Sequence, residues 1–473
     1  MMAATVLRKE LRALVRDGRF VVLAVSLSLL LASLLFASAQ QQRRLAHEKA
    51  QVSELVRQQW DSQGDKHPHR GAHFGLYAFR PDSPLAVVDP GLGPYLGQAL
   101  WLEPHRRNMT RFRPAADEPP SVRFGSFTPA FVLQALLPLL IVALAFNAVS
   151  LERESGTLRM LHSAGLPGRA LLAGKFLALL AVVSLVPLAA VGAGLASVTA
   201  GAWPGADTAW RAAVLAGTFL IYCGVFAALA LAVSAMVASS RRALFVLLGL
   251  WIAFVFVVPR LGAASAQAAA PLPTAERFWG DIQRDYAEGL PGDGALAVRN
   301  ERFDAELLRR HNVRRLEDLP FGAYALRRME RDAYADRVHA IHFGRLWDRY
   351  AMQESIARIA SALSPTAAMR AISMKLSGTD LAHQRHFEEA AEQYRRRANI
   401  RIDQWDMDNT RGLTSFDDKY AGDALWRSVD AFHYTPPNIA FALRAALPDL
   451  GLLLAWAMAA CGLLVLAARR LRP

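Results

Sequence analysis

The group of side chains best suited to bind a metal is a histidine cluster, His67, His69 and His73, in the segment HPHRGAH. Imidazole nitrogens are good ligands for zinc or copper. The segment is rich in Gly and Pro and contains no cysteine, so its spacing is a weak indicator and we assign no metal site from the sequence. His383 and His386 share one face of a helix by their spacing, and a solvated surface explains them better than a metal site does.

A phosphate-binding loop is the second chemistry to consider, because Gly174 is followed by Lys175. A P-loop requires G-x-x-x-x-G-K and then Ser or Thr. Here Phe176 follows the lysine and Arg169 occupies the position of the first glycine. We also find no Ser-His-Asp order and no paired acids typical of an active site. We therefore expect a protein that is not an enzyme and binds no cofactor of its own.

Ionisable residues in the middle of apolar spans would indicate ion-coupled transport. The centres of the apolar spans in this chain carry none, and Lys175 and Asp449 lie near span ends, where snorkelling or interfacial water satisfies them. This disfavours a secondary carrier. The polar residues left for a translocation path, each with helix packing as the alternative, are Gln134, Asn147 and Tyr222.

Long apolar segments must position these side chains. Hydrophobic residues make up 53% of the 473 residues and are concentrated in charge-free blocks. A bilayer core of about 30 Å requires about 20 such residues per helix. We predict an all-α membrane protein whose six transmembrane helices lie at residues 20–39, 127–149, 171–199, 210–237, 243–258 and 447–468. The fifth is short, so a re-entrant or buried segment is its alternative.

The orientation follows from Lys and Arg in the short segments between spans. Basic residues occur in residues 1–19, in the loop 150–170, at Arg241-Arg242 and in the tail 469–473. With six spans, all four segments fall on one side, which we predict to be the cytoplasm. Both termini are then cytoplasmic, and the long insertions, residues 40–125 and 259–446, lie outside.

The two insertions differ in character. Residues 41–60 are compatible with a helix, and the rest of the first insertion is broken by Gly and Pro into turns and short extended pieces. The second insertion predicts long helices at residues 323–363 and 379–408. We expect a large, mainly helical extracytoplasmic domain carried on extensions of spans five and six. Residues 366–376 form a short amphipathic piece, either along the outer membrane surface or packed within the domain.

The net charge of +13 does not indicate nucleic-acid binding. Much of the charge flanks the spans or alternates with Glu and Asp, as on a solvated surface, and no nucleic-acid-binding motif is evident. Residues 1–19 place apolar side chains on one helix face, which predicts an interfacial helix or, alternatively, a water-exposed cap. Its basic residues are Arg8, Lys9, Arg12 and Arg16.

The loop 150–170 combines charge and glycine between two spans. Glu152 and Glu154 precede Gly156-Thr157, a helix-compatible stretch follows from Leu158, and a Gly- and Pro-containing turn leads into the third span. A short helix held between two spans could transmit motion. An ordinary solvated loop is the alternative.

The segment LERESGTLRMLHSAGLPGRALLAGK resembles the cytoplasmic loop of ABC-2-type permeases, which has an E-x-G-T-L element after span two and a Lys that opens span three. The matching positions are Glu154, Gly156, Thr157, Leu158 and Lys175. Residues 378–397, GTDLAHQRHFEEAAEQYRRR, resemble a bacterial permease group catalogued as domain of unknown function 3526.

The resemblance implies a multi-pass permease subunit in the bacterial cytoplasmic (inner) membrane. It would pair with a second permease, identical or homologous, and with a cytoplasmic ABC ATPase dimer that holds ATP and Mg²⁺. Export or extraction from the membrane is the usual direction, and the N-terminal helix would support the ATPase contact. The implied ATPase-coupling residues are Glu152, Arg153, Glu154, Gly156, Thr157, Leu158 and Arg159.

A second class of function stays open, namely a membrane-anchored sensor or scaffold whose domain binds a periplasmic partner.

Overall fold

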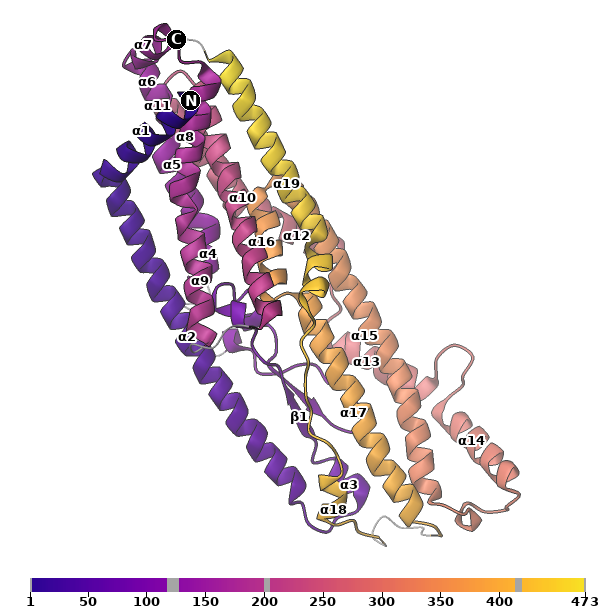
Figure 1. Ribbon diagram of the computed structural model, residues 1–473. Helices are drawn as coiled ribbons and strands as arrows, with labels where there is room; N and C mark the ends of the chain where they lie inside the picture. Colours follow the sequence, from indigo (N-terminus) through magenta and orange to yellow (C-terminus); the bar gives the residue numbers. More distant parts are fainter. Residues whose placement is uncertain (1, 117–126, 200–204, 413–418, 472–473) are drawn as a thin grey trace.

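The protein consists of a helical bundle and a domain that projects from one end of it. The computed structural model describes residues 2–116, 127–199, 205–412 and 419–471. Both termini lie at the end of the bundle opposite the domain (Figure 1), and we call this the terminal end. The described parts of residues 40–116, 270–364 and 378–438 form the projecting domain. The predicted insertion boundary at Gly125 and the tail residue Arg472 lie outside the described residues.

Six helices of the described chain are long and apolar enough to cross a membrane, as predicted. They comprise α2 (Gly18–Asp61); α4 (Pro129–Phe131), η4 (Val132–Leu136) and α5 (Leu137–Ala145), leading to α6 (Ser150–Glu154); α8 (Gly168–Val183) with α9 (Leu185–Thr199); α10 (Ala206–Met236); α11 (Ser240–Ile252), η5 (Ala253–Val257) and α12 (Val258–Ala269); and α19 (Ile439–Arg470). The fifth span is 30 residues long, so a short length no longer favours a re-entrant or buried segment over a crossing helix.

Two of the spans contain a π-helical turn, η4 and η5, where the regular hydrogen bonding of the helix changes. Side chains from other helices bind carbonyl oxygens there. Trp251 Nε1 donates to the oxygen of Ala135 at 2.8 Å, and Ser364 Oγ donates to that of Phe254 at 2.6 Å. These bonds satisfy backbone groups that find no water inside an apolar bundle.

The first span does not end where its apolar residues end. Helix α2 continues from the predicted span limit at residue 39 to Asp61 without a break, because no Gly or Pro interrupts it. At its far end Trp60 is buried against Trp426, with ring centroids 5.9 Å apart and its Nε1 donating to the Trp426 carbonyl at 2.9 Å. The domain is therefore carried on an extension of span one as well, which our prediction of extensions from spans five and six missed.

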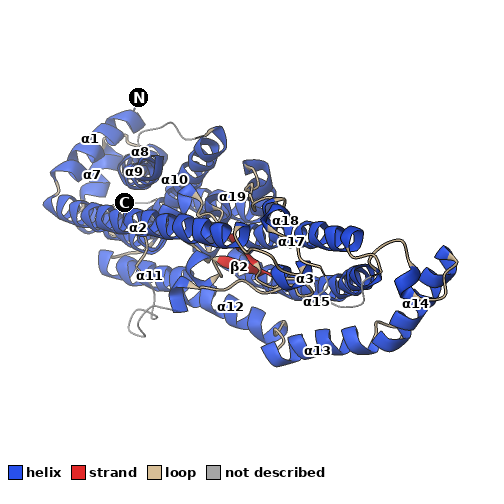
Figure 2. Ribbon diagram, turned by 90° about the horizontal axis from the view of Figure 1, so that it is seen from below, coloured by secondary structure: helices blue, strands red, loops and turns tan. Residues whose placement is uncertain are grey.

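The projecting domain is mainly helical, and two short antiparallel strands pair Leu76 with Leu102. Helix α14 stands away from the remaining helices in both views (Figures 1 and 2). The elements are α3 (Pro68–Ala72), β1 (Leu76–Phe79), η1 (Pro84–Val87), η2 (Gly93–Tyr95), β2 (Ala99–Leu102), η3 (Pro114–Ala116), α13 (Ala275–Glu288), α14 (Leu296–His311), η6 (Leu316–Asp318), α15 (Ala323–Leu363), α17 (Leu381–Asn409) and α18 (Asp423–Arg427).

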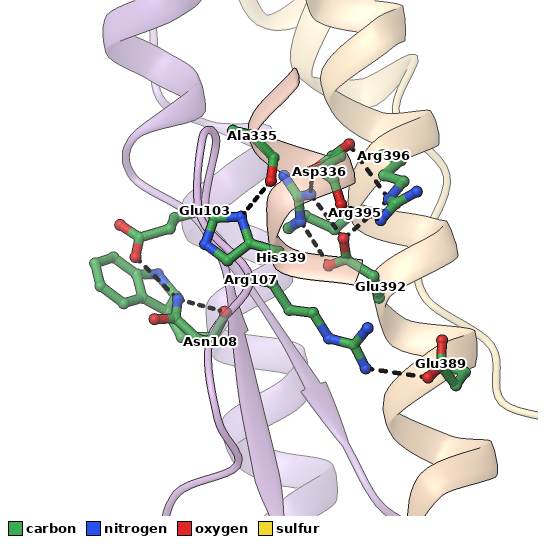
Figure 3. Close-up of polar contacts among 11 residues, drawn as sticks. Glu103, Arg107, Asn108, Ala335, Asp336, His339, Glu389, Glu392, Arg395 and Arg396 are labelled. Atoms are coloured by element: carbon green, nitrogen blue, oxygen red, sulfur yellow. Dashed lines mark hydrogen bonds and ion pairs between the residues drawn. The ribbon is translucent and has the colours of Figure 1, made fainter. Parts of the chain in front are cut away.

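Buried ion pairs join α15 to α17 in this domain. Arg328 binds Asp403 and Asp406, both at 2.6 Å, and all three side chains are less than 10% exposed. Nearer the membrane-spanning bundle, Arg395 of α17 pairs with Asp336 of α15 (Figure 3). Removing one partner from such a pair leaves a buried charge uncompensated, so the pairs fix the alignment of the two helices.

His339 of α15 is a buried titratable group at the interface between α15 and α17. Its Nδ1 lies 2.7 Å from the carbonyl oxygen of Ala335 (Figure 3). Burial, together with the positive charges of Arg395 and Arg107, lowers the pKa of His339 to about 4. The imidazole is therefore neutral at physiological pH.

Helix α16 (Pro365–Ser377) lies inside the bundle, which corrects both of our predictions for residues 366–376. It packs between α10 and α19 (Figure 1), and nine of its thirteen residues are buried. Its first turn reaches the middle of α10, where Thr366 Oγ1 lies 2.9 Å from the hydroxyl of Tyr222. Ser364 caps α16 directly after α15, so the two helices form a re-entrant hairpin. Such a hairpin is tolerated because the surrounding helices cover it.

Candidate functional site

The connection between the second and third spans folds into two short helices at the terminal end (Figure 1). Helix α6 (Ser150–Glu154) is followed by Gly156, with φ of +78°, and by α7 (Thr157–Ser163). A left-handed backbone favours glycine at this corner. A Cβ at Gly156 would meet nothing within 4 Å, so glycine is required for its backbone conformation and not for space.

Two of the predicted docking side chains bind neighbouring helices: Arg153 is partly buried, while Glu154 stays exposed. Arg153 donates to the carbonyl oxygens of Ala235 at 2.6 Å and Val237 at 2.9 Å, at the end of α10. Glu154 accepts from the backbone N–H of Ser240 at 2.7 Å and from its hydroxyl at 2.9 Å, at the start of α11. Each charge has the sign that suits the helix end it caps. The α6 segment is thereby fastened to both helices.

Glu152 belongs to a buried cluster that also includes the N-terminal helix. Lys175 Nζ lies 2.9 Å from Glu152 Oε1 and 2.9 Å from Glu10 Oε1, and the lysine side chain is only 4% exposed. Burial opposes ionisation of Glu10, but Lys175 and Lys9 outweigh it and hold the pKa of this carboxyl below its usual range. The cluster joins α1, α6 and α8. It corrects the prediction that Lys175 is satisfied by snorkelling at a span end.

Helix α1 (Met2–Arg16) is seated directly on α8. A Cβ added at Gly174 would lie 2.6 Å from Cβ of Val6, so glycine permits the close approach of the two helices. Val6 is buried in this contact. The predicted basic residues of this helix all remain exposed, namely Arg8, Lys9, Arg12 and Arg16.

Helix α7 presents a free outer face. Leu158 is fully buried in the core of the bundle and holds the helix down. On the other side Thr157 and Arg159 are exposed, and Met160 is 72% exposed. The predicted coupling residues thus fall into two groups: Glu152, Arg153, Glu154 and Leu158 anchor the element, while Thr157 and Arg159 lie on its surface.

The three polar residues predicted for a translocation path do not form one group. Tyr222 donates to the carbonyl oxygen of Gln134 at 2.6 Å, and the Gln134 amide lies 3.4 Å from Asp89. Both residues are buried where α16 enters the bundle. Asn147 is located thirteen residues further along the same span, next to α6. Gln134 and Tyr222 therefore support α16, and Asn147 lies at the terminal end.

Asp449 is also buried and paired, which corrects the expectation of an interfacial acid. It is 1% exposed, and its Oδ2 lies 2.7 Å from Nζ of Lys375 on α16. Lys375 also binds Glu354 at 2.7 Å, and Arg358 lies 3.4 Å from Asp449. Four charges from three helices thus hold the re-entrant hairpin against α19.

Sequence reasoning missed four members of these clusters, namely Glu10, Lys375, Glu354 and Arg358. Glu10 is the only acidic residue of α1, which was a usable signal that it has a specific partner. Lys375 stands in a mostly apolar segment, and a lysine there points to a buried counter-ion. Neither partner could be identified from sequence, because Glu10 lies 165 residues from Lys175 and Lys375 lies 74 residues from Asp449.

Six apolar helices and a re-entrant hairpin define a multi-pass membrane protein. Comparison with protein families then specifies its kind. Residues 112–273 match the ABC-2 family transporter protein, and residues 275–435 match the domain of unknown function DUF3526. A segment that matches the ABC-2 transporter family is thus followed by a DUF3526 domain, which is the combination that the sequence predicts for a permease. No curated protein matches its sequence. The first match contains the α6–α7 element, and the second covers most of the projecting domain from α13 to α18.

Proposed function

We propose that this permease is driven by a separately encoded cytoplasmic ABC ATPase, which docks on α7 and carries the ATP and Mg²⁺. The observation that carries the proposal is the division of the α6–α7 element into anchors and a free face. Arg153, Glu154 and the Lys175 cluster tie it to α10, α11, α8 and α1. Arg159 and Met160 remain available on the surface.

A short helix with such anchors suits the transmission of force. A partner that grips α7 would move α6 with it, because α6 is bound at both ends of the α10–α11 connection. Met160 supplies an apolar side chain for a groove, and Arg159 supplies a charge at its edge, as in helix-in-groove recognition. The four exposed basic residues of α1 lie at the same end and would support the contact (Figure 1).

In this proposal the terminal end faces the cytoplasm of a bacterium and the chain spans its inner membrane. The basic short segments support this orientation through the positive-inside rule. The projecting domain then lies in the periplasm, where it could meet a partner protein. Substrate would be exported or extracted from the membrane between two permease subunits. The weakly buried faces of the first and fifth spans, with 17% and 11% of their apolar windows buried, are available to lipid and to the second subunit.

The experiment introduces negative charge on the exposed face of α7. R159E and M160E are made in the complete transporter. Two quantities are measured: co-purification of the ATPase, and the stimulation of its ATP hydrolysis by the permease in the absence of substrate. We expect at least a tenfold loss of stimulation with the bundle still folded. R310E, an exposed arginine on α14 in the projecting domain, is the matched control and should change neither quantity.

Full stimulation in both α7 variants would refute the docking site. If no ABC ATPase co-purifies even with the wild-type chain, the sensor or scaffold hypothesis is favoured instead.

A further inference from the structure

Three histidines from two segments of the chain meet in the projecting domain. His69 and His73 lie on and directly after α3, and His105 follows β2. One ring nitrogen from each lies within 4.8 Å of the others, and the Nε2 atoms of His69 and His73 are 3.2 Å apart. The grouping differs from the one in the sequence, because Nε2 of His67 instead faces Asp406, at 3.8 Å. His105 takes the place of His67.

We propose that His69, His73 and His105 bind a late first-row divalent metal ion of the zinc class. Zinc binds imidazole nitrogens at about 2.0–2.1 Å in a tetrahedral arrangement, which places two ligand nitrogens about 3.3 Å apart. The separation between His69 and His73 already has this value. The ring of His105 needs to approach by about 1.5 Å, which a side-chain rotation can supply.

Asp332 of α15 binds one ring nitrogen of His105, as carboxylates commonly do for histidines that bind zinc through the other ring nitrogen. It binds Nδ1 of His105, which leaves Nε2 as the nitrogen free to face a metal. The second carboxylate oxygen of Asp332 is buried and has no hydrogen-bond partner among the described residues. A carboxylate in this position fixes the ring and makes the other nitrogen more basic. His105 also holds a left-handed backbone, with φ of +65°, which is uncommon outside glycine.

The surroundings favour this class of ion over others. Among the residues that the structure describes, the group consists of three imidazoles, whereas Mg²⁺ and Ca²⁺ require oxygen ligands. Arg328 of α15, whose charge acts on His69 and His73, is paired with Asp403 and Asp406, so its charge is compensated.

The site is accessible and connects the two insertions. His73 is exposed, and His69 and His105 are half-buried, so an ion can enter and a water molecule can complete the coordination. α3 and the segment after β2 belong to the first insertion, while Asp332 belongs to the second. An ion bound here would therefore fasten the first insertion to α15 and stabilise the folded domain.

The test uses the full-length chain in detergent, purified without a polyhistidine tag and stripped with a chelator. Titration calorimetry with Zn²⁺ should find one site per chain, and the same Zn²⁺ should raise the unfolding temperature. H69Q/H105Q should abolish both effects. D332N should weaken binding 10- to 100-fold, as loss of a supporting carboxylate does. H433Q, an exposed histidine elsewhere in the domain, is the matched control and should bind like the wild type.

Metal-free melting curves establish that each variant is folded before it is titrated. Binding that survives in H69Q/H105Q, or that falls equally in H433Q, would overturn the proposal. So would a wild-type chain that binds no Zn²⁺ and gains no thermal stability from it. Competition by Cu²⁺ or Ni²⁺ but not by a large excess of Mg²⁺ would support the assigned class of ion.

Discussion

Substitution of Lys175 by methionine tests the cluster that joins α1, α6 and α8. The change keeps the length and apolar stem of the side chain and removes only its charge. Glu10 and Glu152 then lose the buried cation that both bind at 2.9 Å, and the exposed Lys9, at 2.7 Å from Glu10 and 3.9 Å from Glu152, is the cation that still faces them. Their side chains are 15% and 14% exposed, so water can screen them only partly.

The size of the effect follows from this geometry. Two carboxylate oxygens that share one nitrogen at 2.9 Å are less than about 6 Å apart, and like charges at that distance repel by about 3 kcal/mol at an effective dielectric constant of 20. Breaking a fully buried ion pair costs about 3–5 kcal/mol. With the residual exposure of the two acids, we expect K175M to lower the free energy of unfolding by about 2–4 kcal/mol.

The assay is reversible unfolding of the purified chain in mixed detergent micelles at neutral pH. K9M is the control, because Lys9 is 64% exposed and should contribute less than about 1 kcal/mol. The triple variant K175M/E10Q/E152Q removes the repulsion and should recover most of the loss. If K175M is no more destabilising than K9M, or if the triple variant recovers nothing, the cluster does not hold α1 and α6 as we argue.

Two further predictions concern the corner before α7 and the interior of the domain. G156A should lower the free energy of unfolding by about 1–2 kcal/mol, because alanine is strained at a φ of +78°. The control is G280A, in the interior of α13 with open space around it, which should be neutral or stabilising. Equal losses of unfolding free energy in the two variants would contradict the argument. The pKa of His339 is about 4 in the folded state and about 6.5 in the unfolded state. Between pH 6.5 and pH 4 only the unfolded state binds the proton, so the free energy of unfolding falls as the pH drops through this range. Since a tenfold change in proton affinity is worth about 1.4 kcal/mol, the loss approaches roughly 3 kcal/mol. Unfolding free energies at pH 7 and 4.5 should therefore differ less in H339Q than in the wild type, and parallel profiles would refute the assignment.

The sequence predicted the spans and long helices well because each is determined locally. Charge-free blocks marked the six spans, and the absence of Pro and most Gly marked α15 within residues 323–363. It did not reveal that residues 365–377 enter the bundle. That outcome depends on Lys375 meeting Asp449 and on Thr366 meeting Tyr222, which are contacts between distant segments.

The same distinction applies to the two candidate sites. The position of the α6–α7 element followed from its charge and glycine, but the roles of its residues did not. The sequence predicts that Glu154 contacts the ATPase, whereas in the structure its carboxylate caps α11 through Ser240. In the histidine group, two of the three members, His69 and His73, were visible in one segment of the sequence. The third, His105, lies 32 residues beyond His73 and is brought in by the β1–β2 pairing.

The unbroken course of α2 has a mechanical consequence. At 1.5 Å per residue its 44 residues form a rod about 66 Å long, with one end beside α1 and the other locked by Trp60 against Trp426. A tilt of about 5° at the membrane would carry the far end of such a rod through about 6 Å. Small angular changes near the terminal end are thus magnified into displacements as large as a side chain at the tip of the projecting domain.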